Sequence, residues 1–268
     1  MTQIADFQIE ALNDAQSSEN RIHSDEIAEK FGFRGALVSG VNVFGYMSQA
    51  LIQSLGEEIL NKGFMQVRFL KPAYEHDLVS VKSEPAFSVV KKRYNVSKAY
   101  NQDGELLAQL DSWISDEPAP IDKLANVSKG KQISERQEIK WDLINLLEPS
   151  PTYLWKPSKA NNLQRVSSQR DDSPLYKGDD AYIHPYYLLD ACNKALMRMF
   201  ILPAWIHVGS KLHIREPMRI NEEIAVHAVP VRKWLRKGHQ FIELYICMKK
   251  ENRVVLEAEH TAIYRIAT

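Results

Sequence analysis

Residues 17–33, SSENRIHSDEIAEKFGF, place a polar side chain, Asn20, three positions before His23. An imidazole gains and loses a proton near neutral pH, so His23 could act as a general acid or base. A structural explanation is also available, because Ser24 can cap a short helix that Gly32 would end. Asn20 could in the same way form a local turn through its side-chain amide. The residues alone leave both explanations open.

The composition is that of an ordinary globular protein, with 44% hydrophobic residues and equal numbers, 34 each, of basic (Lys, Arg) and acidic (Asp, Glu) side chains. A chain without net charge has no overall field that would attract nucleic acid or an anionic membrane, so we expect neither as a partner. The first residues, MTQIADFQIEALNDAQ, include acids and lack a long apolar run, which argues against a secretion signal. Cys192 and Cys247 lie far apart in sequence and fit a reducing compartment, so we expect the protein to be cytoplasmic.

The sequence contains a weak internal repeat. VRFLKPAYEHDLVSVKS in the first half is similar to KLHIREPMRINEEIAVH in the second, and SENRIH and GELLAQLDSWI are similar to DDSPLY and NRVVLEAEHTAIY. Matched residues are 145 positions apart in the middle of the repeat, 153 before it and 149 after it. The matches pair Pro72 with Pro217, Asp77 with Glu222, His23 with Tyr176, and Leu107 with Leu256. Such a repeat indicates a fold of two similar units.

Each unit is predicted to contain one long helix followed by antiparallel strands. Apolar residues follow helical spacing in one stretch of each unit and alternate in the stretches after it. The predicted helices are 41–60 and 186–200, and the predicted strands are 64–70, 78–84, 87–100, 105–114, 205–214, 223–231, 241–250 and 254–266. Gly45 weakens the first helix unless another group packs closely against it. This is an α+β pattern in which one face of a sheet packs on the helix.

Two units side by side would protect the sheet edge that each leaves unpaired, so we expect a pseudo-dimer within one chain. The predicted N-terminal unit is 1–120 and the predicted C-terminal unit is 151–268. Residues 121–150 between them are polar at first and then carry an amphipathic patch. We therefore interpret this segment as a linker that partly docks on the units.

The motif NRIHSDEIAEKFGFRGALVSG and the later VRFLKPAYEHDLVSV resemble the MaoC-like hydroxyacyl-thioester dehydratases, also called the hydratase 2 family, which have the hotdog fold. The family signature is Asp-x-Asn-Pro-(Leu/Ile)-His, followed by a helix ending in Gly-Phe and a strand that leads to a Gly at the start of the central helix. The resemblance covers most of residues 17–114 and, more faintly, 165–266. It implies two tandem hotdog domains that hydrate 2-enoyl thioesters or dehydrate 3-hydroxyacyl thioesters.

The resemblance also assigns roles to individual residues. His23 matches the catalytic histidine, and Asn20 matches the motif asparagine. Gly40 matches the residue whose backbone N–H holds the thioester carbonyl at the helix start, where free N–H groups and a positive partial charge suit an enolate-like oxygen. Ser18 replaces the motif aspartate, and a serine is not a base at neutral pH. Either Glu19 or another carboxylate is then the partner of His23, unless His23 acts alone or the site is inactive.

The second unit departs from the signature in the opposite way. It keeps Asp171, but Tyr176 takes the place of the histidine. If His184 and Pro185 align with Ser39 and Gly40, the carbonyl donor is also lost, because proline has no N–H. We therefore expect the site in the first unit and a wall of the acyl tunnel in the second.

Three functions stay open at this point: a hydratase or dehydratase, a non-catalytic acyl-thioester-binding protein, and a thioesterase. The expected partner is an acyl-coenzyme A or acyl-carrier thioester, and the basic runs 90–94 and 231–239 could bind the coenzyme A phosphates or be solvated hairpin tips. We expect no cofactor and no metal, since His207 and His213 have no evident third ligand. A homodimer of such double units is also compatible with the sequence.

Overall fold

The computed structural model describes residues 6–117, 119–126, 130, 133 and 135–267. The first half consists of β1 (Phe7–Glu10), the short 3-10 helix η1 (Arg21–His23), α1 (Asp25–Lys30), α2 (Gly40–Leu55), α3 (Ile59–Lys62), β2 (Gly63–Phe69), β3 (Leu78–Ser83), β4 (Phe87–Val89), β5 (Lys92–Tyr100) and β6 (Leu106–Ser115). Two 3-10 helices follow, η2 (Lys123–Asn126) and η3 (Trp141–Leu143). The second half consists of β7 (Tyr153–Trp155), α4 (Lys159–Ser168), η4 (Pro174–Tyr176), α5 (Tyr186–Met199), β8 (Ile206–Ile214), β9 (Ile224–Arg236), β10 (His239–Lys250) and β11 (Arg253–Arg265). None of the described helices is both long and apolar enough to cross a bilayer.

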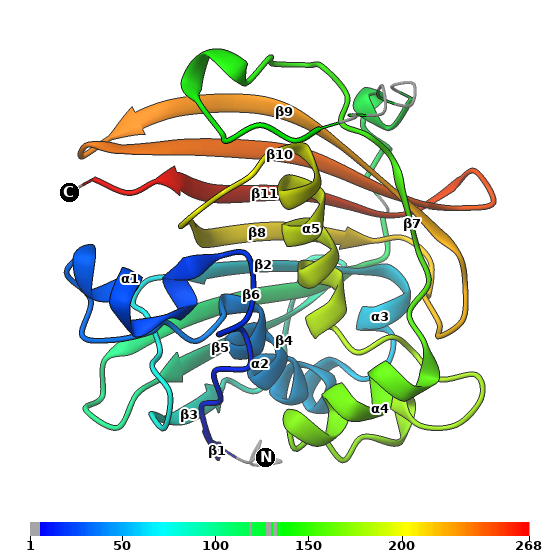
Figure 1. Ribbon diagram of the computed structural model, residues 1–268. Coiled ribbons are helices and arrows are strands. Elements are labelled where there is room, and N and C mark those ends of the chain that lie inside the picture. Colours follow the sequence, from blue (N-terminus) through cyan, green and yellow to red (C-terminus); the bar gives the residue numbers. More distant parts are fainter. Residues whose placement is uncertain (1–5, 118, 127–129, 131–132, 134, 268) are drawn as a thin grey trace.

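One curved antiparallel sheet of 11 strands runs through both halves (Figure 1). Its order is β1-β3-β5-β6-β2-β8-β11-β10-β9-β7, and β4 pairs with β5 off this path. The strands β3-β5-β6-β2 of the first half are thus repeated in reverse as β8-β11-β10-β9 in the second. The α+β class and the side-by-side arrangement of two units are confirmed.

Strands β2 and β8 form the seam between the two halves. Gln66 on β2 pairs with Lys211 on β8, and these residues are themselves separated by the repeat offset of 145. A residue that pairs with its own repeat equivalent marks a pseudo-two-fold axis. The same offset relates two loop hydrogen bonds, from Val38 N–H to Ala73 C=O and from Ile183 N–H to Met218 C=O.

The offset of 149 for the last strand is wrong by one residue. Gln66 on β2 also pairs with Asp111 on β6, whereas its equivalent Lys211 pairs with Glu259 on β11, so the offset between these strands is 148. Because side chains alternate between the two faces of a strand, a shift of one residue would exchange buried and exposed positions. The corrected offset matches Ile114 with Ala262, which are both buried, whereas the offset of 149 matches Ile114 with the partly buried Ile263.

Two predicted elements are interrupted by turns. The helix predicted over 41–60 ends at Leu55, because Gly56 adopts a left-handed conformation with φ of 75°. The strand predicted over 87–100 is a hairpin instead: the chain reverses between β4 and β5, where Val90 and Lys91 have φ of 32° and 59°. When a hairpin turn contains no glycine, apolar and polar residues that alternate on both sides of the turn predict a single strand.

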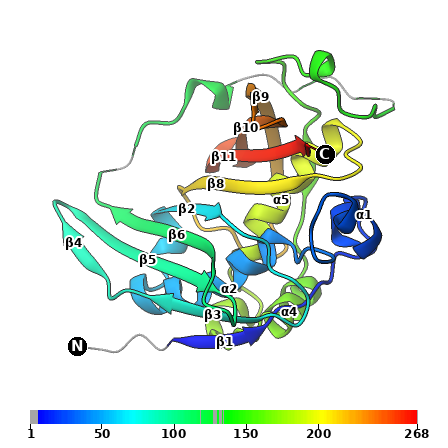
Figure 2. The same ribbon diagram turned by 90° about the vertical axis from the view of Figure 1, so that its left-hand side faces the viewer.

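Helices α2 and α5 both lie on the inner face of the sheet (Figures 1 and 2). Helix α2 is buried on nearly all sides, as its largely apolar sequence requires. The Gln169 side chain of the second half packs on Gly45, where a β-carbon would lie only 2.5 Å from the amide oxygen. This contact supplies the close neighbour expected from the glycine and joins the two halves behind the sheet.

The chain passes from the first half to the second between Ser115, the end of β6, and Tyr153, the start of β7. The described part of this segment docks on the second half: Ile144 is buried, and the Lys233 ammonium donates to the carbonyl groups of Trp141 and Ile144. Positions 127–129, 131–132 and 134 of the predicted linker lie outside the described residues. The domain boundaries at 120 and 150 stay a prediction.

Gly209 allows the backbones of β2 and β8 to approach at the seam. A β-carbon at this position would lie 2.8 Å from the carbonyl oxygen of Val67, so the strands would have to shift. We expect Gly209→Ala to lower the free energy of unfolding by about 1–3 kcal/mol, measured by urea denaturation. Lys211→Ala, an exposed change on the same strand, is the control and should stay within about 0.5 kcal/mol of wild type. Equal stabilities of the two variants would contradict this role of Gly209.

Candidate functional site

The motif loop forms the 3-10 turn η1, which is repeated in the second half as η4. The Asn20 side chain caps η1 by accepting a hydrogen bond from Ile22 N–H at 3.4 Å. Ser173, which is 153 positions later, caps η4 by accepting from Leu175 N–H at 3.4 Å. The predicted offset of 153 for this motif is therefore confirmed by equivalent capping bonds.

Helix α1 follows η1 directly. The hydroxyl of Ser24 donates to Arg21 C=O and does not cap the helix through its side chain, contrary to the expectation. Gly32, just after the helix, has φ of 82° and ends it as expected. The turn and short helix hold residues 20–32 as a compact unit beside the sheet.

Asn20 also ties the motif loop to the second half. Its amide oxygen accepts from Trp205 N–H at 3.0 Å, and its amide nitrogen donates to Trp205 C=O at 3.0 Å. Both residues are buried, and Trp205 immediately precedes β8. A side-chain amide thus replaces a missing strand partner, which fixes the loop relative to the seam.

The ring of His23 is held by two polar neighbours. Its Nδ1 atom lies 2.7 Å from Leu37 C=O, which can only accept, so Nδ1 carries the proton and Nε2 keeps its lone pair. The Asn20 amide nitrogen, which can only donate, lies 3.3 Å from Nε2, so its N–H is directed at the Nε2 lone pair. Burial lowers the pKa of His23, so the imidazole is neutral at pH 7 and Nε2 can accept a proton.

A cavity of about 320 Å³ lies between the two halves and contains both His23 and Gly40 in its lining. Residues of both halves form its wall, including Phe69 from the first half and Trp205, His207 and Ile263 from the second. Gly40 is the first residue of α2, and no described group accepts a hydrogen bond from the N–H groups of Gly40 and Val41. Of the two residues, Gly40 lines the cavity, so its N–H can receive a ligand oxygen.

Gly40 is also required by packing. A β-carbon at this position would lie 3.2 Å from the ring of Phe69, which is closer than an ordinary contact. The glycine therefore leaves room for the aromatic ring that forms part of the cavity wall. Both explanations considered for Gly40, close packing and a free N–H, are compatible with the structure.

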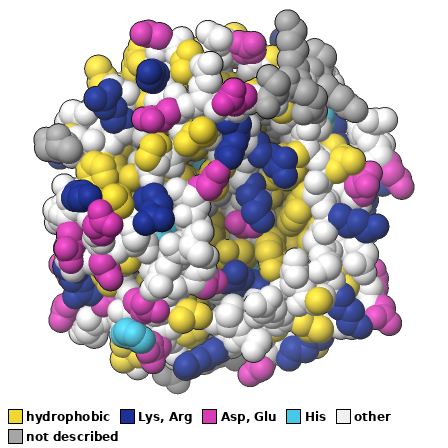
Figure 3. Space-filling model, in the orientation of Figure 1, with side chains coloured by type: hydrophobic (Ala, Val, Ile, Leu, Met, Phe, Trp, Pro, Cys, Tyr) yellow, Lys and Arg dark blue, Asp and Glu magenta, His cyan; other side chains and the backbone are white. Residues whose placement is uncertain are grey.

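Glu19 is the one predicted site residue that the structure does not bring to the cavity. Both of its carboxylate oxygens accept from the Arg136 guanidinium, at 2.6 and 2.9 Å. The pair lies in a groove on the face that carries α5, which Figure 3 shows hollowed, with hydrophobic and basic side chains gathered around it. Arg136 lowers the pKa of Glu19, which keeps the carboxylate ionised. Ser18, in the place of the motif aspartate, donates to Asn20 C=O at 3.2 Å.

No described carboxylate lines the cavity. Its titratable side chains are His23, Lys71, His207 and His239. Lys71 forms an ion pair with Glu105, and His239 Nδ1 accepts from Ala267 N–H. The sequence indicates His207 only as a possible metal ligand. Its place in the cavity wall results from the pairing of β8 with β2 between the two halves, and no local sequence pattern indicates this pairing. In the described part of the chain, no three potential metal ligands gather, and His213 stacks on Phe64 away from this cavity.

His207 belongs to a buried chain of polar side chains. Its Nε2 atom lies 2.8 Å from Ser210 Oγ, and Ser210 Oγ lies 2.9 Å from His260 Nδ1. Burial lowers the pKa of His207 to about 3 and that of His260 far below its usual value. Both imidazoles are therefore neutral throughout the physiological range of pH.

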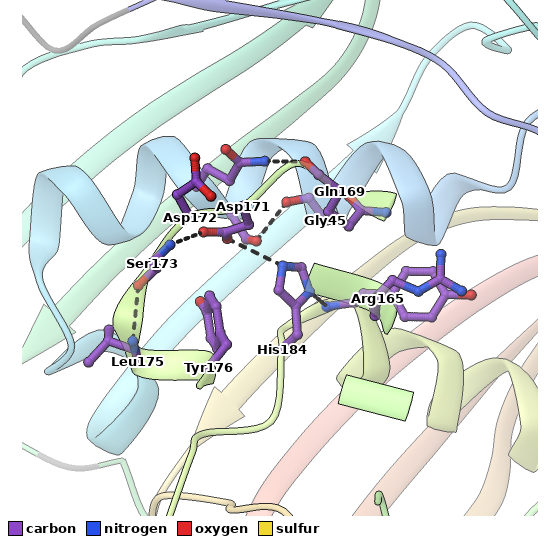
Figure 4. Close-up of polar contacts among 12 residues, drawn as sticks. Gly45, Arg165, Gln169, Asp171, Asp172, Ser173, Leu175, Tyr176 and His184 are labelled. Carbon is purple, nitrogen blue, oxygen red and sulfur yellow. Dashed lines mark hydrogen bonds and ion pairs between the residues drawn. The ribbon is translucent and has the colours of Figure 1, made fainter. Parts of the chain in front are cut away.

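The equivalent place in the second half is filled by a sealed polar cluster (Figure 4). Asp171 accepts from Ser173 N–H at 2.9 Å, and its carboxylate lies 3.4 Å from His184 Nε2. Asp171, Tyr176 and His184 are all buried, and none of them lines the cavity. Pro185 precedes α5 where Gly40 begins α2, as the offset of 145 predicts.

Comparison with known proteins adds the fold family. No family model and no curated protein matches this sequence. Among solved structures, the chain is similar to a protein described as a MaoC domain dehydratase from Chloroflexus aurantiacus, with a TM-score of 0.71, 11% identity and coverage of 96% of this chain and 93% of that one. It is also similar to a Mycobacterium tuberculosis protein described as a double hotdog fold, with a TM-score of 0.64, 11% identity and coverage of 98% and 96%. The chain has the double hotdog fold.

Double hotdog structures similar to this chain carry more than one activity in their descriptions. One of them is described as an oleoyl thioesterase from Lactobacillus plantarum, with a TM-score of 0.54, 10% identity and coverage of 98% of this chain and 96% of that one. At such identities the similarity establishes the fold alone. The choice of reaction must therefore come from the site.

Asn20→Ala should destabilise the double hotdog chain. Removing the amide leaves both Trp205 backbone groups buried without partners, so we expect the free energy of unfolding to fall by about 1–3 kcal/mol in urea denaturation. Ser18→Ala, two residues earlier, removes a single bond to a carbonyl and serves as the matched control, with a smaller expected loss. A stable Asn20→Ala variant would show that Asn20 does not hold the loop.

The buried imidazoles predict a loss of stability in acid. The unfolded chain binds a proton at His207 below about pH 6.5, whereas the folded chain does not until about pH 3. The stabilisation is therefore complete above pH 6.5 and falls on acidification by about 1.4 kcal/mol per pH unit for this residue. Urea denaturation at several pH values should show a shallower dependence in His207→Gln than in wild type. An unchanged dependence would contradict the burial of a neutral imidazole.

Proposed function

We propose that this chain hydrates a 2-enoyl thioester, or dehydrates a 3-hydroxyacyl thioester, in the cavity between its two halves. The observation that carries the proposal is that His23, whose Nε2 carries no proton, lines the same cavity as Gly40, whose N–H has no acceptor among the described residues. A base and an oxyanion donor facing one mostly apolar cavity are the parts that this chemistry requires.

Each group then has a defined task. The thioester oxygen binds at Gly40 N–H, where the helix start stabilises the negative charge that develops on it. His23 Nε2 takes a proton from water while the water oxygen bonds to C3, and the imidazolium then delivers that proton to C2. One water molecule is thus added across the double bond, and His23 returns to its neutral form. Asn20 positions the ring by donating to the Nε2 lone pair, and water must displace this contact before Nε2 can take its proton.

The carrier is proposed to be coenzyme A. Of the two basic runs, only 231–239 reaches the cavity, through His239. Arg236 and Lys237 beside it are exposed and form no ion pair with another described residue. In the other run, Lys91 and Arg93 pair with Glu117 and Glu58, and Lys92, which forms no ion pair with another described residue, does not line the cavity. The run 231–239 therefore has free cations next to the cavity, where phosphate groups could bind.

A thioesterase is the second candidate. His23 has no described carboxylate within hydrogen-bond reach, and hydrolysis needs only a base for water and N–H donors for the tetrahedral intermediate. In that reaction the water oxygen bonds to the thioester carbon and the thiol leaves with the proton from His23. A chain that binds the thioester without turnover is the third candidate.

His23→Ala tests the role of the imidazole. With crotonyl- and longer 2-enoyl-coenzyme A, we expect the loss of enoyl-thioester absorbance to slow by about 10²–10⁴-fold, because the group that transfers the proton is gone. Glu19→Gln, whose side chain lies outside the cavity, is the control and should keep near wild-type rates.

A second assay separates the candidate reactions. Free thiol detected with a chromogenic disulfide would identify a thioesterase, and loss of the enoyl band without thiol release would identify a hydratase. Binding of the same thioesters with neither signal would leave the non-catalytic function and contradict the proposed hydration.

A further inference from the structure

Ser39 directly precedes α2 and occupies the N-cap position of that helix. An N-cap serine usually accepts a hydrogen bond from an N–H group in the first turn of its helix. The Ser39 side chain forms no such bond, and Asn42 N–H and Val43 N–H donate to the Ser39 backbone carbonyl, at 2.9 and 3.4 Å. The hydroxyl is therefore not used to begin the helix.

The Ser39 hydroxyl has no other partner, although the residue lies inside the molecule. Only 8% of Ser39 is exposed, and its hydroxyl forms no hydrogen bond with a described residue. The oxygen is still accessible, since it does not belong to the described side-chain atoms that are both unpartnered and fully buried. Ser39 lines the cavity between the two halves, so its accessible surface faces this cavity. Because enclosed polar groups are nearly always hydrogen-bonded, the hydroxyl is available for a ligand there.

Covalent geometry keeps this hydroxyl close to the proposed carbonyl donor. Four bonds connect Ser39 Oγ with the backbone nitrogen of Gly40, so the two atoms lie at most about 5 Å apart in any rotamer. One oxygen can therefore lie about 2.9 Å from each of them. A carbonyl oxygen has two lone pairs and can accept both hydrogen bonds, whereas a single N–H leaves one lone pair unused.

The second half lacks both donors. At the offset of 145, His184 takes the place of Ser39, and Pro185 takes the place of Gly40. His184 is fully buried beside Asp171 and does not line the cavity, and Pro185 has no N–H. The pair of donors therefore belongs to the same half as His23.

We propose that the Ser39 hydroxyl is a catalytic hydrogen-bond donor that binds the thioester oxygen together with Gly40 N–H. The inference rests on the proposed function, because it requires a thioester in the cavity, and it applies to hydration and to hydrolysis alike. In either reaction negative charge develops on this oxygen, so a second donor stabilises the transition state more than the neutral substrate. Ser39 keeps its proton throughout, and His23 performs the proton transfer.

Ser39→Ala tests the donor through kinetics. We expect kcat of the thioester reaction to fall by about 10²–10³-fold, the loss that follows removal of one oxyanion donor, and Ser39→Thr, which keeps a hydroxyl, to recover most of the rate. The urea midpoint of Ser39→Ala should equal that of wild type, because the hydroxyl forms no bond within the folded chain. Ser48→Ala is the matched control: this hydroxyl of the same helix donates to Gly45 C=O, lies outside the cavity and should leave kcat unchanged.

The infrared band of a bound thioester carbonyl reports the hydrogen bond directly. Hexanoyl-coenzyme A labelled with carbon-13 at the thioester carbonyl cannot be hydrated, and its carbonyl band should shift to lower frequency on binding to wild type. Ser39→Ala should lose part of this shift, and Ser48→Ala should keep it. Thiol release is followed in the same samples, which shows whether the ligand stays intact and supplies kcat if the chain hydrolyses it.

The outcomes distinguish the two proposals. An unchanged kcat or an unchanged carbonyl shift in Ser39→Ala would overturn the donor role and leave the proposed function in place. Transfer of the acyl group to Ser39, detected by mass spectrometry of the whole chain, would also overturn it, since Ser39 would then be a nucleophile. Failure of wild type to bind any thioester would instead contradict the proposed function itself.

Discussion

The pairing of β2 with β8 is the constraint on which the site depends. It makes one sheet out of two similar halves and brings the start of β8 to the start of α2 in the other half. The backbones meet closely at Gly209 and Val67, where no side chain fits between them. The cavity exists because the helices and loops on either side of this seam leave a space that neither half could enclose alone.

The site is held by contacts that cross the seam. The Asn20 side-chain amide forms hydrogen bonds with the backbone N–H and C=O of Trp205, and it also contacts the candidate catalytic residue His23. Gln169 packs on Gly45 and donates to Asn42, which couples the helix of the first half to the second half. The orientation of the imidazole is thus linked to the packing of the whole molecule.

Much of the fold could be predicted because the repeat includes residues that form the same local hydrogen bond in both halves. Asp77 and Glu222 both accept from a backbone N–H three residues earlier, at Tyr74 and Arg219, so their spacing of 145 survives in the sequence. Turns without glycine, such as the one at Val90, carry no such signal and were read as strand.

The site was predictable only in part, for a similar reason. His23, Asn20 and Gly40 belong to local motifs, and the structure places all three in the cavity wall. Proximity in sequence favours Glu19 as the partner of His23, but the Glu19 carboxylate is bound by Arg136, which lies far along the chain. His207 faces the cavity because of strand pairing between the halves, so single-sequence patterns could not assign it.

The continuous sheet has one further consequence. Had two separate copies formed this assembly, every substitution would occur on both sides of the axis, and the copies would dissociate on dilution and open the cavity. In a tandem chain each substitution occurs on one side only, and the two halves stay joined at any protein concentration. The two halves differ in this way: Ser18 replaces the motif aspartate in the first half, and Tyr176 replaces the motif histidine in the second. Neither half has to keep the complete set of reactive groups, because a change in one is not repeated in the other.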